Sequence, residues 1–221
     1  MATISEEFFE KFCRDQGINC ERIEEDGETS PDYLLRIQDH IIIAEVKEIE
    51  KNKEERESYK LLKERGRGKV LTNEPGDRVR SKIRKASPQI KARTEGKYSG
   101  ILVLFDGGNS FRHLDPYNIR VAMLGLEQIH INIPNNLNQS PYSTGISHGP
   151  KRKMTENANT SISAIAAMYC DREGTTSINI FHNPYAAIPL NLEFLNFPRI
   201  TQFLLNTESC SSASGWVKYE P

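Results

Sequence analysis

The sequence lacks the short motifs that mark several large protein classes. It contains no Gly-x-Ser-x-Gly elbow, no phosphate-binding glycine–lysine loop and no internal repeat, so a serine hydrolase of that type, a P-loop NTPase or a repeat protein is not indicated. No stretch approaches the ~20 apolar residues of a membrane-spanning helix, and the acidic N-terminus does not resemble a secretory signal. We therefore expect a cytoplasmic protein without membrane contact.

Cysteine and histidine are sparse as well. The four cysteines include no Cys-x-x-Cys pair, and the five histidines form no local cluster with the spacing of metal ligands. Cys13 and Cys170 lie on apolar faces, which is typical of small core residues in a cytoplasmic protein. We interpret His182, which ends a predicted strand before an Asn-Pro turn, as a hydrogen-bonded turn residue.

Length and patterning predict one α/β domain over residues 1–221, because 221 residues are enough for a full core and few for two domains. Residues 134–160, rich in Asn, Pro, Ser and Gly, are expected to form a long loop. The chain after residue 206 is expected to be a loose tail whose Trp216 docks onto the body.

Apolar periodicity predicts the individual elements. Helices are expected over 5–16 (N-cap Ser5, end at Gly17), 77–94, 115–124 (N-cap Asp115) and 192–205, the last interrupted near Pro198. Strands are expected over 32–38, 41–47, 98–106, 128–133, 161–170 and 177–182, the last two paired as a hairpin. Pro88 predicts a kink in the helix over 77–94, or a new start capped by Ser87.

Charge is distributed unevenly along a chain whose net charge is only -1. Residues 1–50 hold 5 basic and 14 acidic side chains, whereas residues 51–97 hold 16 basic and 7 acidic ones. A basic block thus follows an acidic one. Chemistry on phosphodiesters benefits from this polarity, because acids can hold a metal ion and neighbouring cations attract the polyanion.

The most informative motif is the strand Ile41–Lys47, read as IIIAEVK, with a Pro31-Asp32 pair ahead of it. Alternation puts Glu45 and Lys47 on one face of the strand, and a tight turn at residues 39–40 would fold Asp32 back level with Glu45. Two converging carboxylates repel each other and are best tolerated with a divalent cation between them. The alternative interpretation is a solvated strand end and an ordinary turn.

Together, Pro31, Asp32, Glu45 and Lys47 resemble the motif of the PD-(D/E)xK nuclease superfamily. The resemblance covers roughly the first half of the chain and implies a restriction-endonuclease-like fold, an α/β core with a central mixed sheet flanked by helices. It implies that Asp32, Glu45 and the backbone carbonyl of Val46 bind one or two Mg²⁺ or Mn²⁺ ions. It also implies that Lys47 positions or activates the attacking water.

Two further residues match secondary positions of that superfamily. A glutamate on the first helix often reaches the metal site, and Glu6 has the best spacing, with Glu10 as the alternative. Either could equally be an ordinary partner of the helix dipole. A glutamine on the helix after the lysine strand often lies near the catalytic residues, and Gln89 is the match here.

Basic residues after the motif are the predicted nucleic-acid surface. Arg65, Arg67 and Lys69 form a glycine-containing loop, whereas Arg78, Lys82, Lys85 and Arg93 lie beside the apolar stripe of one helix. The segment 51–63, in which signs alternate, is interpreted as a solvated charged helix. A second basic segment, Gly149–Lys153, is the alternative binding surface.

These observations predict a magnesium-dependent phosphodiesterase, an endonuclease acting on DNA, and a homodimer is compatible with cleavage of both strands. Two alternatives remain open. One is an inactive module of the same fold that binds nucleic acid or protein. The other is a structural or regulatory subunit of a defence or mobile-element complex, with the 134–160 loop as its contact surface.

Overall fold

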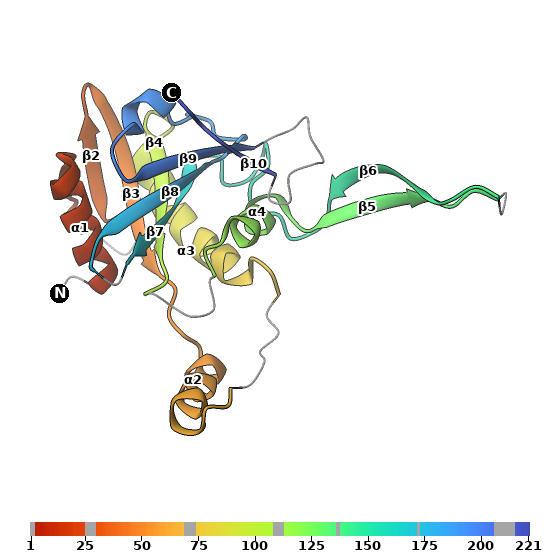
Figure 1. Ribbon diagram of the computed structural model, residues 1–221. Helices are drawn as coiled ribbons and strands as arrows, with labels where there is room; N and C mark the ends of the chain where they lie inside the picture. Colours follow the sequence, from red (N-terminus) through yellow and green to blue (C-terminus); the bar gives the residue numbers. More distant parts are fainter. Residues whose placement is uncertain are drawn as a thin grey trace.

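The structure is an α/β fold built on one large mixed β-sheet. The computed structural model describes residues 3–24, 30–68, 74–107, 113–135, 138–171, 173–205 and 215–221. Helices pack against the sheet, and a two-stranded arm extends away from it (Figure 1). The predicted class, a mixed sheet flanked by helices, is therefore confirmed. None of the helices in these ranges is long and apolar enough to cross a membrane.

Within the described chain, the main sheet has eight strands in the order β1-β2-β3-β4-β7-β8-β9-β10. Their bounds are β1 (Asn19–Arg22), β2 (Tyr33–Ile37), β3 (His40–Glu48), β4 (Ser99–Phe105), β7 (Ala164–Cys170), β8 (Thr176–His182), β9 (Ile200–Leu205) and β10 (Trp216–Lys218). The first three strands form an antiparallel meander, and β3, β4 and β7 are parallel neighbours. β7 and β8 form the predicted hairpin.

The helices are α1 (Ile4–Gln16), α2 (Lys53–Arg65), α3 (Asp77–Thr94), α4 (Pro116–Leu124) and a short 3-10 helix, η1 (Leu192–Leu195). Thr3, rather than Ser5, caps α1 in a capping box with Glu6. α3 continues through Pro88, so the predicted new start at Ser87 is wrong. Pro88 and Arg84 are both exposed, and water can therefore reach the carbonyl that the proline leaves without an intrahelical donor.

Alternating side chains give the sheet two separate hydrophobic cores. On one face, α1 packs Phe9 against a cluster that includes Val46 of β3. On the opposite face, α3 packs Ile83 into a second cluster. Since Val46 belongs to the α1 side, its neighbours Glu45 and Lys47 project toward the α3 side. The strand pleat therefore decides which helix borders the predicted site.

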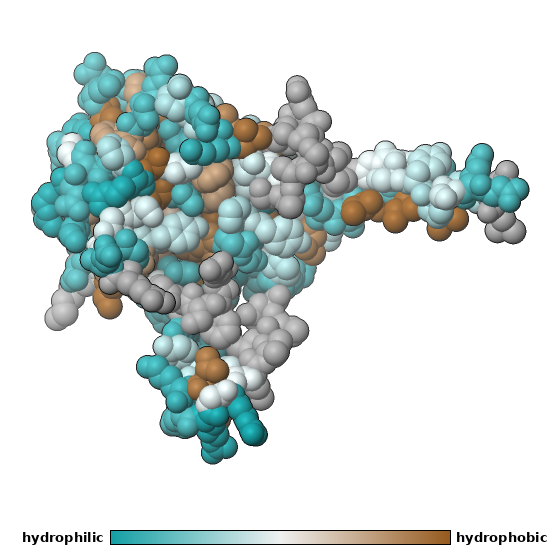
Figure 2. Space-filling view, in the orientation of Figure 1, coloured by the Kyte–Doolittle hydropathy of each residue, from teal (hydrophilic) through white to brown (hydrophobic). Residues whose placement is uncertain are grey.

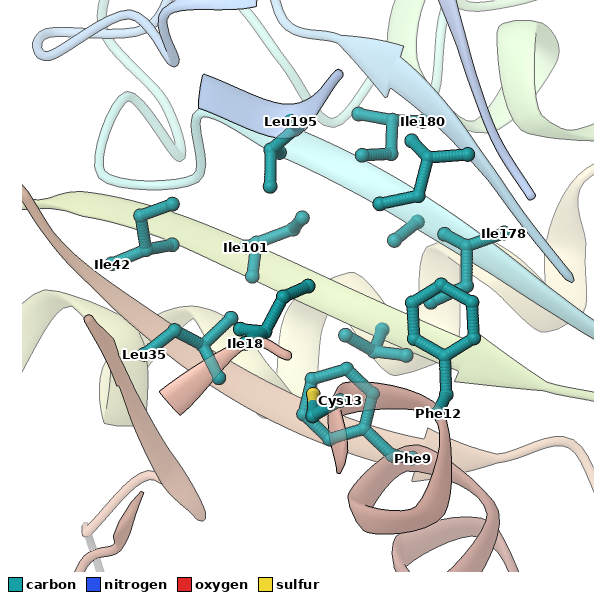
Figure 3. A pocket seen from close by; sticks show the side chains of 13 residues that line it. Phe9, Phe12, Cys13, Ile18, Leu35, Ile42, Ile101, Ile178, Ile180 and Leu195 are labelled. Carbon is teal, nitrogen blue, oxygen red and sulfur yellow. The ribbon is translucent and has the colours of Figure 1, made fainter. Parts of the chain in front are cut away.

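A cavity of about 20 Å³ lies inside the core on the α1 side (Figure 3). Its wall consists of side chains from α1, the sheet and η1, among them Phe9, Phe12, Cys13, Ile42 and Leu195. An apolar cavity of this kind stays dry and contributes no polar group to chemistry. We interpret it as a packing void.

The projecting arm consists of β5 (Glu127–Asn132) and β6 (Tyr142–His148), which pair antiparallel. The prediction of one continuous loop over 134–160 is therefore wrong for residues 142–148. Ile129, Ile131 and Ile133 are exposed along the arm, and the arm shows an apolar edge in Figure 2. The polar strand β6 pairs outside the main sheet, so it has no core-facing apolar alternation by which its sequence could be recognised.

The C-terminal part differs most from expectation. Instead of a helix over 192–205, the chain forms η1 and then β9, which lies between β8 and β10. The predicted docking of Trp216 is confirmed, because its side chain is buried and its indole N–H donates to the Pro116 carbonyl at 3.0 Å. Of the predicted loose tail after residue 206, residues 206–214 lie outside the described residues, and Trp216–Lys218 form the strand β10 instead.

Candidate catalytic site

The β2–β3 hairpin brings Asp32 and Glu45 together. Tyr33 pairs with Ala44, so the adjacent residues Asp32 and Glu45 come opposite each other at the end of the ladder. The Asp32 amide N–H donates to Glu45 Oε2 at 3.1 Å, and the Val46 amide N–H donates to Asp32 Oδ2 at 2.7 Å. The predicted convergence of the two carboxylates is therefore confirmed, and backbone donors hold each of them in place.

Lys47 covers the buried carboxylate. The Glu45 side chain is 0% exposed and its Oε1 forms an ion pair with the Lys47 ammonium, whose side chain is 26% exposed. Within the described chain, this oxygen makes no hydrogen bond of good geometry. Lys47 thus lies between Glu45 and solvent, which is where a group that orients an incoming water would be placed.

Burial makes both carboxylates hold protons more tightly than usual. It raises the pKa of Glu45 to about 7, and the nearby Asp32 carboxylate adds to this effect while Lys47 opposes it. Burial also raises the pKa of Asp32, against the hydrogen bond from the Val46 N–H and the charge of Lys47. A pair of buried acids that ionise reluctantly is stabilised in its charged form by a bound cation.

Glu6 approaches this pair from the other side of the sheet. Its Oε2 accepts hydrogen bonds from the Thr3 N–H and from Arg22 Nη2, both at 2.8 Å. After burial, the Glu6 charge is one of the causes that raise the pKa of Asp32, so Glu6 lies near that carboxylate. The described residues nevertheless contain no group of three or more His, Cys, Asp or Glu side chains placed to hold a metal. Glu6 therefore lies next to the Asp32–Glu45 pair but does not form a three-carboxylate metal site with it.

Glu10, the alternative on the same helix, has a different set of partners. It accepts a hydrogen bond from the Tyr33 hydroxyl at 2.7 Å and lies 3.7 Å from Arg22 Nη1. Arg22 thus contacts both Glu6 and Glu10 of α1. This cation comes from β1, a strand that the periodicity did not predict because its sequence, NCER, has no apolar alternation.

Gln89 lies beside the site but contacts the backbone. Its Nε2 donates to the Ser30 carbonyl at 3.1 Å, just ahead of Pro31 and Asp32. The glutamine therefore holds the segment that leads into the first carboxylate. This contact also shows that α3 borders the β2–β3 hairpin, as predicted.

The predicted nucleic-acid-binding residues differ in how far they are exposed. Lys82 is half-buried, and burial together with the charges of Lys85 and Lys47 lowers its pKa, which places it near Lys47. Lys85 and Arg93 are exposed on α3, and Arg65 and Arg67 are exposed around the end of α2. Lys69 lies outside the described residues.

Arg78, predicted as a phosphate ligand, already has partners within the protein. Its Nη2 donates to the Glu50 carbonyl and lies 3.4 Å from Glu55, whose side chain is 0% exposed. The same carboxylate lies 3.1 Å from His113 Nε2. Glu55 occupies the third position of an Asn-x-x-Glu capping box, a visible signal, but only the fold shows that it is buried against Arg78.

His182 has the satisfied role that its sequence context predicted. It is buried, and its Nε2 lies 2.9 Å from Gln202 Oε1. Burial lowers its pKa, which keeps the imidazole neutral. This contact accounts for the histidine without a catalytic role.

Comparison of the chain with protein-family models, with curated proteins and with solved structures finds no match. What the protein does must therefore be inferred from its residues and their geometry. Asp32, Glu45 and Lys47 form the central group of the candidate site, and we call them the triplet.

Protonation of Glu45 should make the stability of the metal-free protein depend on pH. The folded pKa of about 7 exceeds the ordinary value of 4.5, so the folded state binds a proton more tightly than the unfolded chain. The free energy of unfolding should therefore fall by up to ~3 kcal/mol as the pH rises from 4.5 to about 7. The raised pKa of Asp32 acts in the same direction.

Urea unfolding with chelator present, at a series of pH values between the two pKa values, measures this effect. Glu45→Gln should flatten the dependence, because the amide does not titrate. An equal fall in stability in the wild type and in Glu45→Gln would show that Glu45 is not the responsible group.

Proposed function

We propose that the protein is a metal-dependent nuclease of the PD-(D/E)xK type that hydrolyses phosphodiester bonds in DNA. The observation that supports this most directly is the hydrogen-bonded Asp32–Glu45 pair with Lys47 on Glu45 Oε1. A mixed sheet with α1 on one face and α3 beside the site agrees with a restriction-endonuclease-like core.

The residues of the triplet fit a magnesium or manganese site. Asp32 and Glu45 supply hard carboxylate oxygens, and their raised pKa values show that the protein alone does not stabilise their charges well. Val46 lies against the pair through its amide, so its carbonyl is the natural further ligand. When bound, the metal would act as a Lewis acid on the phosphate and its leaving oxygen.

The side chains around the pair have separate roles in this mechanism. Lys47 donates hydrogen bonds to the attacking water and aligns it with the phosphorus, while Asp32 and Glu45 keep their positions through the backbone donors. Lys82, close to Lys47, adds positive charge where the phosphate becomes more negative. Gln89 keeps the segment before Asp32 in register.

Incubation with plasmid, linear duplex, single-stranded DNA and RNA tests the proposal directly. Each substrate is combined with magnesium, with manganese or with chelator, and the products are separated on a gel. We expect DNA cleavage with either metal and none with chelator. The absence of cleavage from every combination would contradict nuclease activity.

A binding module without turnover is the second candidate function. It is favoured by the way Arg22 occupies Glu6 and by the two-acid composition of the triplet within the described chain. The same assay separates the two candidates, since retarded but uncut DNA in the presence of metal would identify the binding module.

A further inference from the structure

A second basic site lies on the other flank of α3. Here a pocket of about 280 Å³ is lined by Asp77, Arg80, Ser81, Arg84, Lys151 and Lys153. The first four residues come from the N-terminal half of α3, and the two lysines come from the basic segment Gly149–Lys153. We call this the α3 pocket. None of its residues belongs to the triplet.

Arg80 is the buried cation of the α3 pocket. Its side chain is only 5% exposed, and its Nη2 lies 3.0 Å from Glu74 Oε1 and 3.7 Å from Asp77 Oδ1. Its Nη1 is shielded from solvent and has no hydrogen-bond partner within the described chain. A guanidinium in this position has lost much of its hydration and retains donor capacity, so an anion in the pocket would stabilise it.

Glu74 shows that the cations of this region converge on one anionic group. Its carboxylate accepts from Arg80 Nη2 at 3.0 Å and from Lys151 Nζ at 2.8 and 3.1 Å. The Lys151 ammonium lowers the pKa of this exposed carboxylate. An arginine and a lysine that share one carboxylate are also the cations that proteins use to bind phosphate oxygens.

The lysines of the pocket are held by an ordered segment. The Lys153 amide donates to the carbonyls of Ala122 and Met123 at the end of α4, and the adjacent Met154 side chain is fully buried. A Cβ on Gly125 would lie 2.6 Å from the Gly149 carbonyl oxygen, so glycine permits the close approach of this segment to α4. Lys151 and Lys153 are therefore anchored to the body of the protein.

Charge favours an anionic ligand in the pocket. Four cations, Arg80, Arg84, Lys151 and Lys153, face the two carboxylates of Glu74 and Asp77, which leaves an excess of two positive charges. A phosphodiester group has a single negative charge and four oxygens that can accept from several donors. Its charge and its acceptors therefore match the pocket.

We propose that the α3 pocket binds a backbone phosphate of the nucleic-acid strand whose cleavage is assigned above to the triplet. This inference rests on the proposed function for its ligand. Gln89, which borders the triplet, is nine positions after Arg80 on α3, a rise of about 13 Å along the helix axis and about half a turn around it. The rise alone corresponds to about four nucleotide steps at ~3.4 Å each, so it sets a lower limit on the separation. The pocket would thus hold the strand at least about four nucleotides from the reacting phosphate.

The test compares two double variants in chelator, where no cleavage occurs. Arg84→Ala with Lys153→Ala removes two pocket cations that do not pair with Glu74. Lys11→Ala with Arg14→Ala removes two exposed cations from α1, on the opposite face of the sheet. The affinity for a fluorescein-labelled DNA duplex is measured by anisotropy over a series of salt concentrations.

Loss of one phosphate contact should flatten the slope of log affinity against log salt by about 0.9 and weaken binding about eightfold at ~0.1 M salt. We expect this from the pocket variant and little change from the α1 variant. A slope that changes equally in both variants, or in neither, would overturn the proposal. Circular dichroism confirms that both variants are folded.

A third variant should act in the opposite direction. Glu74→Gln removes the carboxylate that occupies Arg80 and Lys151, so duplex binding should become a few-fold stronger at low salt. If this variant binds the duplex with unchanged or lower affinity, Glu74 does not compete with a DNA phosphate for Arg80 and Lys151, and the proposal is contradicted.

Inorganic phosphate distinguishes the source of the ligand. If phosphate binds the wild type and not the pocket variant, while both bind the duplex equally, the pocket takes a small phosphorylated molecule and the backbone proposal is wrong. Pocket-dependent duplex binding by a protein that never cleaves would keep this inference and refute the nuclease. If the protein cleaves DNA and the pocket variant has an unchanged salt slope, the nuclease proposal is supported and the pocket proposal is refuted.

Discussion

Replacing Lys47 with alanine is expected to reduce the rate of DNA cleavage at saturating enzyme by about 10²–10³-fold, the usual cost of removing one oriented charge from an active site. The ammonium that pairs with Glu45 Oε1 is the group placed to align the attacking water. Duplex affinity without metal should fall only slightly, since one charge among many phosphate contacts is a small share of binding. Single-turnover kinetics and anisotropy measure the two quantities separately.

Lys97→Ala is the matched control for this substitution, because Lys97 is an exposed lysine paired with Glu95 beyond the end of α3. Lys47→Arg adds a second comparison, since it keeps the charge while changing the position and geometry of the donors. Both substitutions at position 47 should impair cleavage, and Lys97→Ala should not. Near-normal cleavage by Lys47→Ala would show that this lysine is an ordinary strand end.

Replacing either acid of the triplet should abolish measurable metal binding. Asp32→Asn and Glu45→Gln keep the size of each side chain and an acceptor oxygen, so the backbone donors of Asp32 and Val46 remain paired. Manganese affinity, measured by calorimetry, should fall by at least ~100-fold in each variant, because even residues that only support metal ligands are worth 10–100-fold. The metal-free variants should be as stable as the wild type or more so at neutral pH, since each removes a buried like charge.

Asp39→Asn provides the control for the metal titration. Asp39 is an exposed acid in the turn of the same hairpin, so its replacement changes the net charge without touching the triplet. Wild-type manganese affinity in both Asp32→Asn and Glu45→Gln would rule out the metal site. If Asp39→Asn lowers manganese affinity as much as the triplet variants do, the titration measures the net charge of the protein and not a specific site.

The sequence by itself was sufficient for features that depend on short-range geometry. Asp32 and Glu45 lie on one hairpin, and the sequence predicted that they meet. The two-residue turn of this hairpin is at Gln38 and Asp39, so the predicted turn at 39–40 was wrong by one position, and the register that puts Asp32 opposite Glu45 follows from the observed turn. The sequence also predicted the end of α1 at Gly17, which adopts a left-handed φ of 69°, and the Asp115 cap of α4. In each case the partners are close in the chain, and few alternative arrangements exist.

Only the tertiary structure decided features that depend on partners far apart in the chain. Arg78 had the pattern of a phosphate ligand, but it pairs with Glu55, 23 positions away. The short apolar run Ile200–Leu205 suits helix or strand equally, and its pairing with β8 and β10 selects the strand. The α3 pocket forms because α4 holds Lys151 and Lys153 beside Arg80, 71 and 73 positions later in the chain. Local periodicity contains no information about such contacts, because their energy is gained only when the whole core assembles.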